Sequence, residues 1–245
     1  MIYATEFGCD PTGQTPCAAQ MQQFLNAVRG KEGRIPPGTY KIESELYFGY
    51  DCSAGSRPSS LDALGGRLIG GGCANTALLW AGTTGSTPSA VLRVSNPRCY
   101  VEGIKVAPLG TNKPDVGLVF QDAEQAVVKD VWVYNTAEGS SLAASQVQAG
   151  FLWDTTWKAS NTTVPTNVDM RLVGCEAESC WRGYFMRTSA RAQGVMLECC
   201  SAKANGGHGF HVFGTSLAMY FCRAKQNGGH ALRVGISGPG IAITS

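Results

Sequence analysis

VMLECCSAKANGGH (Val195–His208) and LAMYFCRAKQNGGH (Leu217–His230) are two copies of one pattern near the end of this sequence. The Cys, Ala, Lys, Asn and His residues that the copies share all recur at an offset of 22 residues. Fixed periods of about 20 to 50 residues are typical of solenoids, because a single unit buries its apolar face only against its neighbours. The repeat therefore predicts a stack of similar coils.

Each unit of the repeat contains three short segments with the periodicity of β-strands. Apolar residues alternate at Val195 and Leu197, break at a two-residue corner, and alternate again from Cys200 to an Asn-Gly-Gly turn. A third segment, Gly209–Phe213, alternates in the same way and turns His211 outward. Side chains of a strand point to opposite faces with period two, and no helical period occurs inside the unit. The unit is typical of an all-β parallel β-helix with three short strands per coil.

The same unit extends towards the N-terminus with longer loops. Its second strand is predicted to start at Ile104, Val131, Cys175, Cys200 and Cys222, and its third at Gly117, Gly150, Gly183, Gly209 and Ala231. Successive starts of the third strand are 33, 33, 26 and 22 residues apart. The long excursions Ala137–Gln148 and Thr155–Asn167 are polar or rich in turn-forming residues, so we expect them to protrude from the lateral surface.

The N-terminal segment has helical periodicity. A helix over about residues 16–29 is predicted, with Thr15 as N-cap, Pro16 at the first helical position and Gly30 after its end. Its apolar stripe consists of Ala18, Met21, Phe24, Leu25 and Val28. Such an amphipathic helix covers the open edge of the first coil. We expect residues 1–45 to form this cap module and residues 46–245 to form coils, which continue or contact a partner beyond residue 245.

Three stretches of the N-terminal module resemble the opening of the pectate-lyase-like superfamily: EFGCDPTGQTPCAA (Glu6–Ala19), MQQFLNA (Met21–Ala27) and RIPPGTYKI (Arg34–Ile42). In that superfamily an FGA-DPTG loop, a helix and an LPPGTY strand begin a right-handed parallel β-helix. The resemblance implies right-handed coils. It also implies kinship with bacteriophage tailspikes and appendages and with secreted polysaccharide hydrolases and lyases. Cys9 and Cys17 depart from the usual residues of this motif, and the resemblance leaves open whether they form a disulfide.

Composition and charge set the outer bounds on function. The 245 residues are 44% hydrophobic with a net charge of +2, and no basic run supports nucleic-acid binding. No apolar stretch is long enough to cross a bilayer, and the first residues do not resemble a signal peptide. We therefore expect no nucleic-acid partner and no membrane insertion, and the resemblance implies a location in a virion tail or outside the cell.

The sequence contains ten cysteines, which raises the question of disulfides or a metal site. Cys175, Cys200 and Cys222 fall at one inward position of successive coils, where a thiol acts as a small apolar group. No CxxC pair exists and the histidines lack the short ligand spacing of a zinc site, so no metal and no cofactor are expected. Cys52 and Cys73 flank a Ser/Gly-rich segment and are a candidate disulfide pair.

The outward residues of the third strand are predicted to stack into a column along the lateral surface. The column contains Val119, Leu152, Phe185, His211 and Arg233, with Gln121, Asp154 and Arg187 two residues further along. In pectate-lyase-like enzymes this sheet lines the sugar-binding cleft, so the resemblance implies a glycan site here. The residues predicted to contact the glycan are Phe185, Arg187, Lys203, His208, Lys225 and His230. Their positive bias favours an anionic glycan.

Cleavage of a polysaccharide requires further groups. A glycosidase needs two carboxyl groups about 5 to 9.5 Å apart, whereas a lyase needs a base and a cation that stabilises the carbanion. The candidates are Asp154 and Glu178 as carboxylates, His211 as base and Arg233 as cation, with Arg187 as an alternative cation. No motif fixes a pair among them, and Glu176 and Glu198 are assigned to other faces.

Three functions fit these observations. The first is a phage tailspike-like β-helix protein, a homotrimer that binds a bacterial surface polysaccharide or other glycan through its lateral face and can depolymerise it. The second is a free secreted polysaccharide hydrolase or lyase, with a glycoside hydrolase as one form. The third is a non-catalytic structural appendage.

Overall fold

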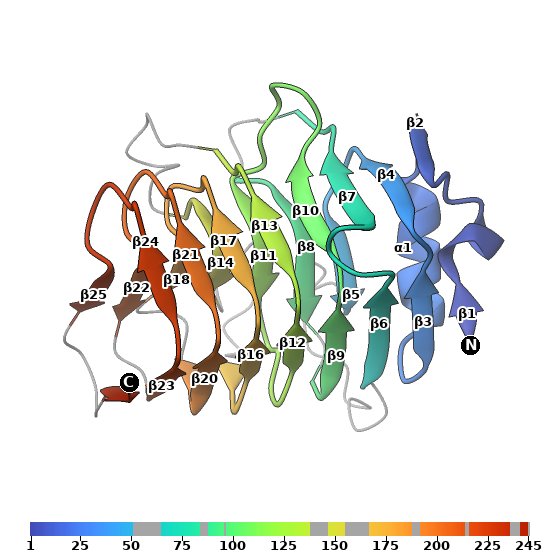
Figure 1. Ribbon diagram of the computed structural model, residues 1–245. Helices are drawn as coiled ribbons and strands as arrows, with labels where there is room; N and C mark the ends of the chain where they lie inside the picture. Colours follow the sequence, from blue (N-terminus) through green and yellow to red (C-terminus); the bar gives the residue numbers. More distant parts are fainter. Residues whose placement is uncertain are drawn as a thin grey trace.

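The computed structural model describes residues 1–50, 65–83, 88–95, 97–137, 147–154, 167–187, 192–213, 216–235 and 241–244. Within these ranges the chain forms a right-handed parallel β-helix, built mainly from three long parallel sheets (Figure 1). Coils are stacked in sequence order from one end of the solenoid to the other, and the third sheet lies behind the other two in this view. The predicted fold class is confirmed.

Each complete coil contributes one strand to each of the three sheets, and the terminal coils contribute to fewer. The first sheet contains, in spatial order, β1 (Ile2–Tyr3), β3 (Glu32–Ile35), β6 (Gly66–Gly70), β9 (Cys99–Glu102), β12 (Val127–Lys129), β16 (Arg171–Val173), β20 (Val195–Glu198), β23 (Leu217–Tyr220) and β26 (Ile241–Thr244). The second contains β2 (Thr12–Pro16), β4 (Gly38–Ile42), β7 (Thr76–Trp80), β10 (Lys105–Pro108), β13 (Trp132–Tyr134), β17 (Glu176–Glu178), β21 (Ser201–Lys203) and β24 (Arg223–Lys225). The third contains β5 (Leu46–Gly49), β8 (Ala90–Ser95), β11 (Val116–Phe120), β14 (Ala149–Trp153), β18 (Tyr184–Met186), β22 (Phe210–Phe213) and β25 (Leu232–Gly235). A short separate pair joins β15 (Asn167–Val168) and β19 (Ala192–Gln193).

The 22-residue repeat is one coil of this solenoid. In the first sheet Val195 lies opposite Leu217, and in the third sheet Phe210 lies opposite Leu232. Residues at equal positions of the two sequence copies are therefore neighbours in space, as the repeat predicted.

Aromatic rings stack along the interior of the third sheet. The ring centroids of Phe120 and Phe151 are 6.5 Å apart, those of Phe151 and Tyr184 are 4.9 Å apart, and those of Tyr184 and Phe210 are 4.8 Å apart. Neighbouring strands are about 4.8 Å apart, so equivalent inward rings of successive coils come into contact. These rings belong to one continuous hydrophobic core that runs the length of the coils.

The glycine that precedes the third strand is required by the close approach of the next coil. A Cβ atom on Gly183 would lie 2.6 Å from the carbonyl oxygen of Gly209 and 2.9 Å from the Cβ atom of Ala202. A side chain at this corner would force the coils apart, because glycine alone lets the backbones come this close.

Asn205 links successive coils at the corner between the second and third sheets. It is buried, and its Oδ1 atom accepts a hydrogen bond of 2.9 Å from the backbone N–H of Cys180. Its Nδ2 atom donates to the Ala177 carbonyl at 3.2 Å and to Oδ1 of Asn227 at 2.8 Å. The side chain therefore satisfies polar groups of the coils on both sides, which a buried corner requires.

The cap helix is present but begins later than predicted. It is α1 (Ala18–Ala27), and Met21, Phe24 and Leu25 form its buried face. Thr15 and Pro16 belong instead to β2, where Pro16 lies opposite Lys41, so the predicted N-cap is wrong. Cys17 takes the N-cap position, and its backbone N–H donates to the Lys41 carbonyl at 2.9 Å. Strand pairing therefore overrides the helix-start signal of Thr-Pro. A 3₁₀ helix, η1 (Ala4–Phe7), precedes β2.

The cysteines of the described residues are free thiols. Cys9 and Cys17 are buried together, and a hydrogen bond between their side chains raises the pKa of the Cys9 thiol. Cys73 is a free, partly exposed thiol, whereas Cys52 lies outside the described residues. Within those residues, no helix has the length and apolar character needed to span a membrane.

Substitution of the stacked cysteines tests the packing of the last coils. Each thiol lies near a backbone carbonyl: Cys200 Sγ is 3.5 Å from the Leu172 oxygen and Cys222 Sγ is 3.4 Å from the Leu197 oxygen. Cys200→Ser should therefore cost only about 1 kcal/mol of unfolding free energy, through lost packing and the shorter reach of the hydroxyl. Cys222→Ser is the matched control and should cost less because Cys222 is partly exposed. Urea denaturation measures both, and an equal or larger loss for Cys222→Ser would contradict the packing explanation.

Candidate functional site

The outward residues of the third sheet lie in one row. Leu152 lies opposite Val119 and Phe185, and His211 lies opposite Phe185 and Arg233. The strand registers therefore bring together the column that the sequence pattern assigned to this face.

Most of this row is covered and is not an open surface. Val119 and Leu152 are fully buried in a second hydrophobic cluster, which also includes Val147 from the segment before β14. Phe185 is 5% exposed and His211 is 4% exposed. The solvent-accessible part of the row begins at Arg233, in the last coil that contributes to the third sheet. The expectation that this column forms an open lateral surface is wrong for Val119, Leu152, Phe185 and His211.

A second row of planar side chains lies beside the first, at the corner between the second and third sheets. The rings of His208 and His230 are nearly parallel, with centroids 5.4 Å apart. His208 contacts His211 at 4.9 Å between ring centroids, and the Arg182 guanidinium carbon lies 4.4 Å from the ring centroid of Phe185. We call Arg182, His208, His211, His230 and Arg233 the basic cluster.

Burial and nearby positive charges lower the pKa values of Arg182, His208 and His211 in the basic cluster. Burial, together with the nearby positive charges of Arg182, His208 and Arg233, lowers the pKa of His211 to about 3. The pKa of His208 is lowered for the same main reason. Burial, together with Arg233 and Arg187, lowers the pKa of Arg182 to about 10. His211 is therefore neutral near pH 7 and is a very weak base, which disfavours it as the proton acceptor of a lyase.

Asp154 and Arg187 form an ion pair at the far end of the third-sheet strands. Asp154 follows β14 and is 1% exposed, and its carboxylate binds Nη1 of Arg187, which follows β18. A buried carboxylate held by arginine is chiefly a structural element, because removal of either partner leaves an uncompensated charge.

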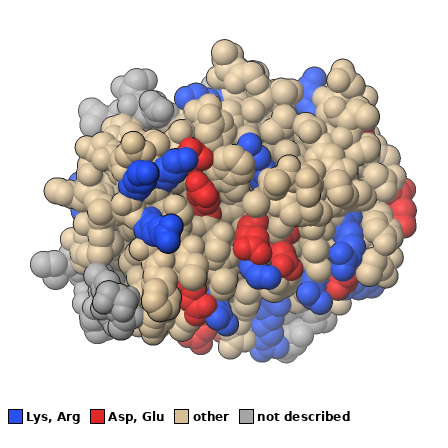
Figure 2. Space-filling model, in the orientation of Figure 1, with Lys and Arg blue, Asp and Glu red and all other residues tan. Residues whose placement is uncertain are grey.

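Glu178, Lys203 and Lys225 lie on the second sheet, away from His211. Nζ of Lys203 lies 2.7 Å from Oε1 of Glu178. Figure 2 shows Lys and Arg side chains gathered at the end of the molecule that carries β21 and β24, next to acidic side chains. Glu178 precedes β18 along its coil, whereas Asp154 follows β14. The two predicted carboxylates are therefore separated by the length of a third-sheet strand and do not form a pair.

The structure brings Glu176 and Glu178 together instead. Both lie on β17 with alternating burial, so their side chains share the outward face of the second sheet, and the assignment of Glu176 to another face is wrong. Residues two apart on a strand are separated by about 6.6 Å. Trp132 and Tyr134, the neighbours of these glutamates on β13, are partly exposed and in edge-on contact at 5.8 Å. Strict period-two alternation from Glu176 would have revealed this pair in the sequence.

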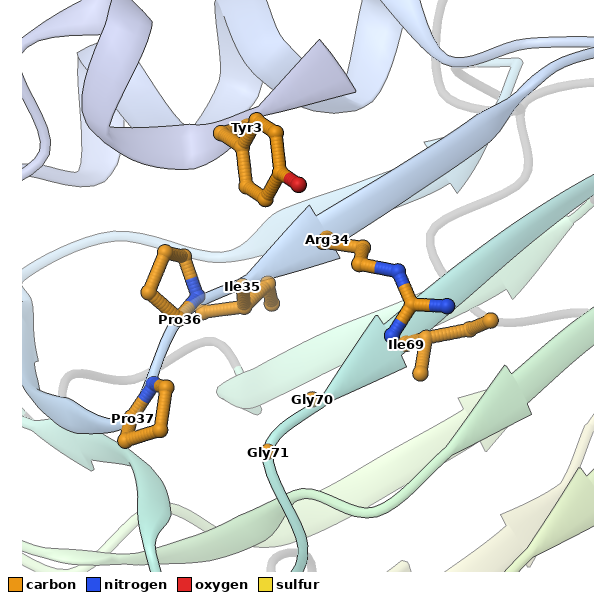
Figure 3. Close-up of a pocket in the computed structure, with 8 residues that line it drawn as sticks. All are labelled: Tyr3, Arg34, Ile35, Pro36, Pro37, Ile69, Gly70 and Gly71. Atoms are coloured by element: carbon orange, nitrogen blue, oxygen red, sulfur yellow. The ribbon is translucent and has the colours of Figure 1, made fainter. Parts of the chain in front are cut away.

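A separate pocket of about 160 Å³ lies at the opposite end of the solenoid (Figure 3). It is lined by Tyr3, Arg34, Ile35, Pro36, Pro37, Ile69, Gly70 and Gly71. Its walls come from β1, β3, β6 and the adjoining turns, and none of the predicted site residues contributes to it.

The residues of the basic cluster do not form a cation site. Throughout the described ranges, no group of three or more His, Cys, Asp or Glu side chains is arranged to hold a metal ion. In the basic cluster the three histidines are accompanied by Arg182 and Arg233, whose charges repel a metal cation.

These features define a right-handed parallel β-helix with a basic cluster at its C-terminal coils. No protein-family model matches the sequence, and no curated protein sequence matches it significantly.

The fold is similar to that of tailspike protein 3 of bacteriophage CBA120, with 11% sequence identity, a TM-score of 0.63, and coverage of 96% of this chain and 33% of the tailspike. It is similar to gene product 12 of bacteriophage phi29, with 12% identity, a TM-score of 0.65, and coverage of 98% and 32%. It is also similar to the catalytic unit of an α-1,3-glucanase from Streptomyces thermodiastaticus, with 14% identity, a TM-score of 0.56, and coverage of 94% and 42%. The chain thus spans about one third of the two phage proteins.

Proposed function

We propose that this chain belongs to a tailspike-like protein that binds a bacterial surface polysaccharide through the lateral face of its C-terminal coils. The observation that carries the proposal is the basic cluster, where planar side chains and hydrogen-bond donors reach the surface together at His230 and Arg233. Sugars are recognised by flat faces for their rings and by hydrogen-bonding groups for their hydroxyls. The fold shared with tailspike protein 3 of bacteriophage CBA120 supports this proposal.

The proposal includes a homotrimer located in a virion tail or outside the cell. The exposed Phe221 and Val234 at the last coils supply apolar surface for contacts between chains. Light scattering measures the assembly state, and a monodisperse monomer across a wide concentration range would contradict the trimer without affecting the glycan site.

A glycan array with the double variant His230→Ala/Arg233→Ala tests the binding site. Both residues are exposed, so the variant should melt within a few degrees of the wild type while binding of the recognised glycan falls at least tenfold. Arg223→Ala is the control because Arg223 is also exposed in the last coils but lies on the second sheet. His211 and Arg187 are unsuitable as test positions because His211 is buried and Arg187 holds the buried carboxylate of Asp154. Absence of glycan binding by the wild type would favour a structural appendage.

A second candidate function, polysaccharide hydrolysis, is supported by Glu176 and Glu178. A glycosidase requires two carboxyl groups about 5 to 9.5 Å apart, and Glu176 and Glu178 are carboxylates at positions about 6.6 Å apart on one strand face, beside Trp132 and Tyr134. If this pair cleaves the glycan, Glu176→Gln and Glu178→Gln should each lower the release of reducing ends at least a hundredfold while glycan binding is retained. A product with an unsaturated sugar would instead support a lyase.

A further inference from the structure

The contact between His208 and Arg233 is electrostatically unfavourable as it stands. Nδ1 of His208 accepts a hydrogen bond of 3.0 Å from the backbone N–H of His230. A neutral imidazole carries one proton, so the proton of His208 is on Nε2. This Nε2 atom lies 3.0 Å from Nη1 of Arg233, and a guanidinium is only a donor. Nε2 of His208 and Nη1 of Arg233 are therefore two donors in contact, and neither accepts a hydrogen bond from the other.

His211, beside this contact, also lacks hydrogen-bond partners. It is 4% exposed, and within the described part of the chain neither of its ring nitrogens has a hydrogen-bond partner. A buried polar group without a partner costs free energy and calls for an explanation, such as a ligand. Its ring lies against His208, with centroids 4.9 Å apart, so its unpartnered nitrogens lie close to the contact between His208 and Arg233.

The surroundings add positive charge and no counter-charge at Arg233. From Cys199 to Ser245 the sequence contains no Asp or Glu, but it contains Lys203, Arg223, Lys225 and Arg233. Among the described residues, no carboxylate forms an ion pair with Arg233. The carboxylates nearest in the coil pattern, Asp154 and Glu178, are already bound to Arg187 and Lys203.

We propose that Arg233, His208 and His211 form a seat for a single oxyanion, the acidic group of a glycan. The inference rests on the proposed function and names the substrate class of that site: a polysaccharide with a carboxylate, sulfate or phosphate substituent. An oxyanion accepts from the Arg233 guanidinium and from Nε2–H of His208 at once, which removes the donor-to-donor contact. Arginine holds such groups with two parallel hydrogen bonds. Exposed Arg233 forms the mouth of the seat and buried His211 its inner wall.

The seat predicts recognition by charge, which a matched pair of ligands tests. Isothermal titration compares oligogalacturonate with its methyl ester, in which a methyl group removes the charge of each carboxylate. Sulfated and phosphorylated dextran identify the preferred oxyanion. Wild type should bind at least one charged glycan at least tenfold more tightly than its neutral counterpart. Arg233→Gln should remove this preference, whereas Arg223→Gln, an exposed arginine of the second sheet in the last coils, should keep it. Equal binding of charged and neutral glycans would overturn the seat and leave the proposed polysaccharide binding intact.

A second measurement tests the seat without any glycan. In protein labelled with ¹⁵N at histidine, titration with sodium acetate, sulfate or phosphate should shift the Nε2 resonance of His208 in wild type and in Arg223→Gln. The shift should be absent in Arg233→Gln. If no anion moves this resonance, the seat is refuted, even where the chain binds glycans. If anions move it but no glycan binds, the seat is supported and the proposed function fails.

Discussion

Phe151→Ala is expected to lower the free energy of unfolding by about 3 to 5 kcal/mol, the usual cost of truncating a fully buried aromatic residue. Phe151 is completely buried between Phe120 and Tyr184 in the stack of rings inside the third sheet. The cavity cannot close easily, because the neighbouring strands are fixed by their parallel pairing to the coils on either side.

The matched control for this substitution is Phe221→Ala. Phe221 is 75% exposed, so the same change of side chain should alter the unfolding free energy by less than about 0.5 kcal/mol. Urea denaturation followed by circular dichroism gives both values from the midpoint and slope. If Phe151→Ala cost no more than Phe221→Ala, the aromatic stack would not be a major source of stability in the coils.

The coil architecture could be predicted from the sequence because the repeat is exact enough to fix register. Once Cys200 and Cys222 occupy one position of successive coils, every neighbouring residue follows, including the alignment of His211 with Arg233. The start of the helix could not be predicted in this way. Thr15 and Pro16 have the local preferences of a helix start, but pairing of β2 with β4 uses them as a strand. Long-range pairing overrode local propensity.

The candidate site was harder to predict because burial of an outward face depends on what covers it. The alternation pattern correctly turned Phe185 and His211 away from the main core, yet both are buried in the structure. Other segments, such as the one that contains Val147, pack over the outward face of the third sheet. The periodicity of a strand does not show which segments cover its face. The placement of Glu176 and Glu178 on one face of β17 follows from strand alternation alone, so it could have been predicted from the sequence.

The buried, neutral state of His211 leads to a pH dependence of stability that the wild type should show between pH 7 and pH 5. In the folded chain the pKa of His211 is about 3, whereas the ordinary value is 6.5. As the pH falls below about 6.5, the unfolded chain takes up a proton at this residue and the folded chain does not. Protonation then stabilises the unfolded state, and the unfolding free energy should fall by at most about 1.4 kcal/mol per pH unit, or about 2 kcal/mol at pH 5.

His211→Phe isolates this contribution, because a phenyl ring keeps the contacts with Phe185 and Phe213 and does not titrate. Denaturation curves of wild type and variant at pH 7, 6 and 5 should diverge, with the wild type losing stability faster on acidification. His208 contributes in the same direction, since its pKa is also lowered in the folded chain, but it is present in both proteins and cancels in their difference. Parallel stability curves would mean that His211 becomes protonated in the folded chain as readily as in the unfolded one. A histidine that accepts a proton so easily would need a negative charge close by, and the basic cluster contains none.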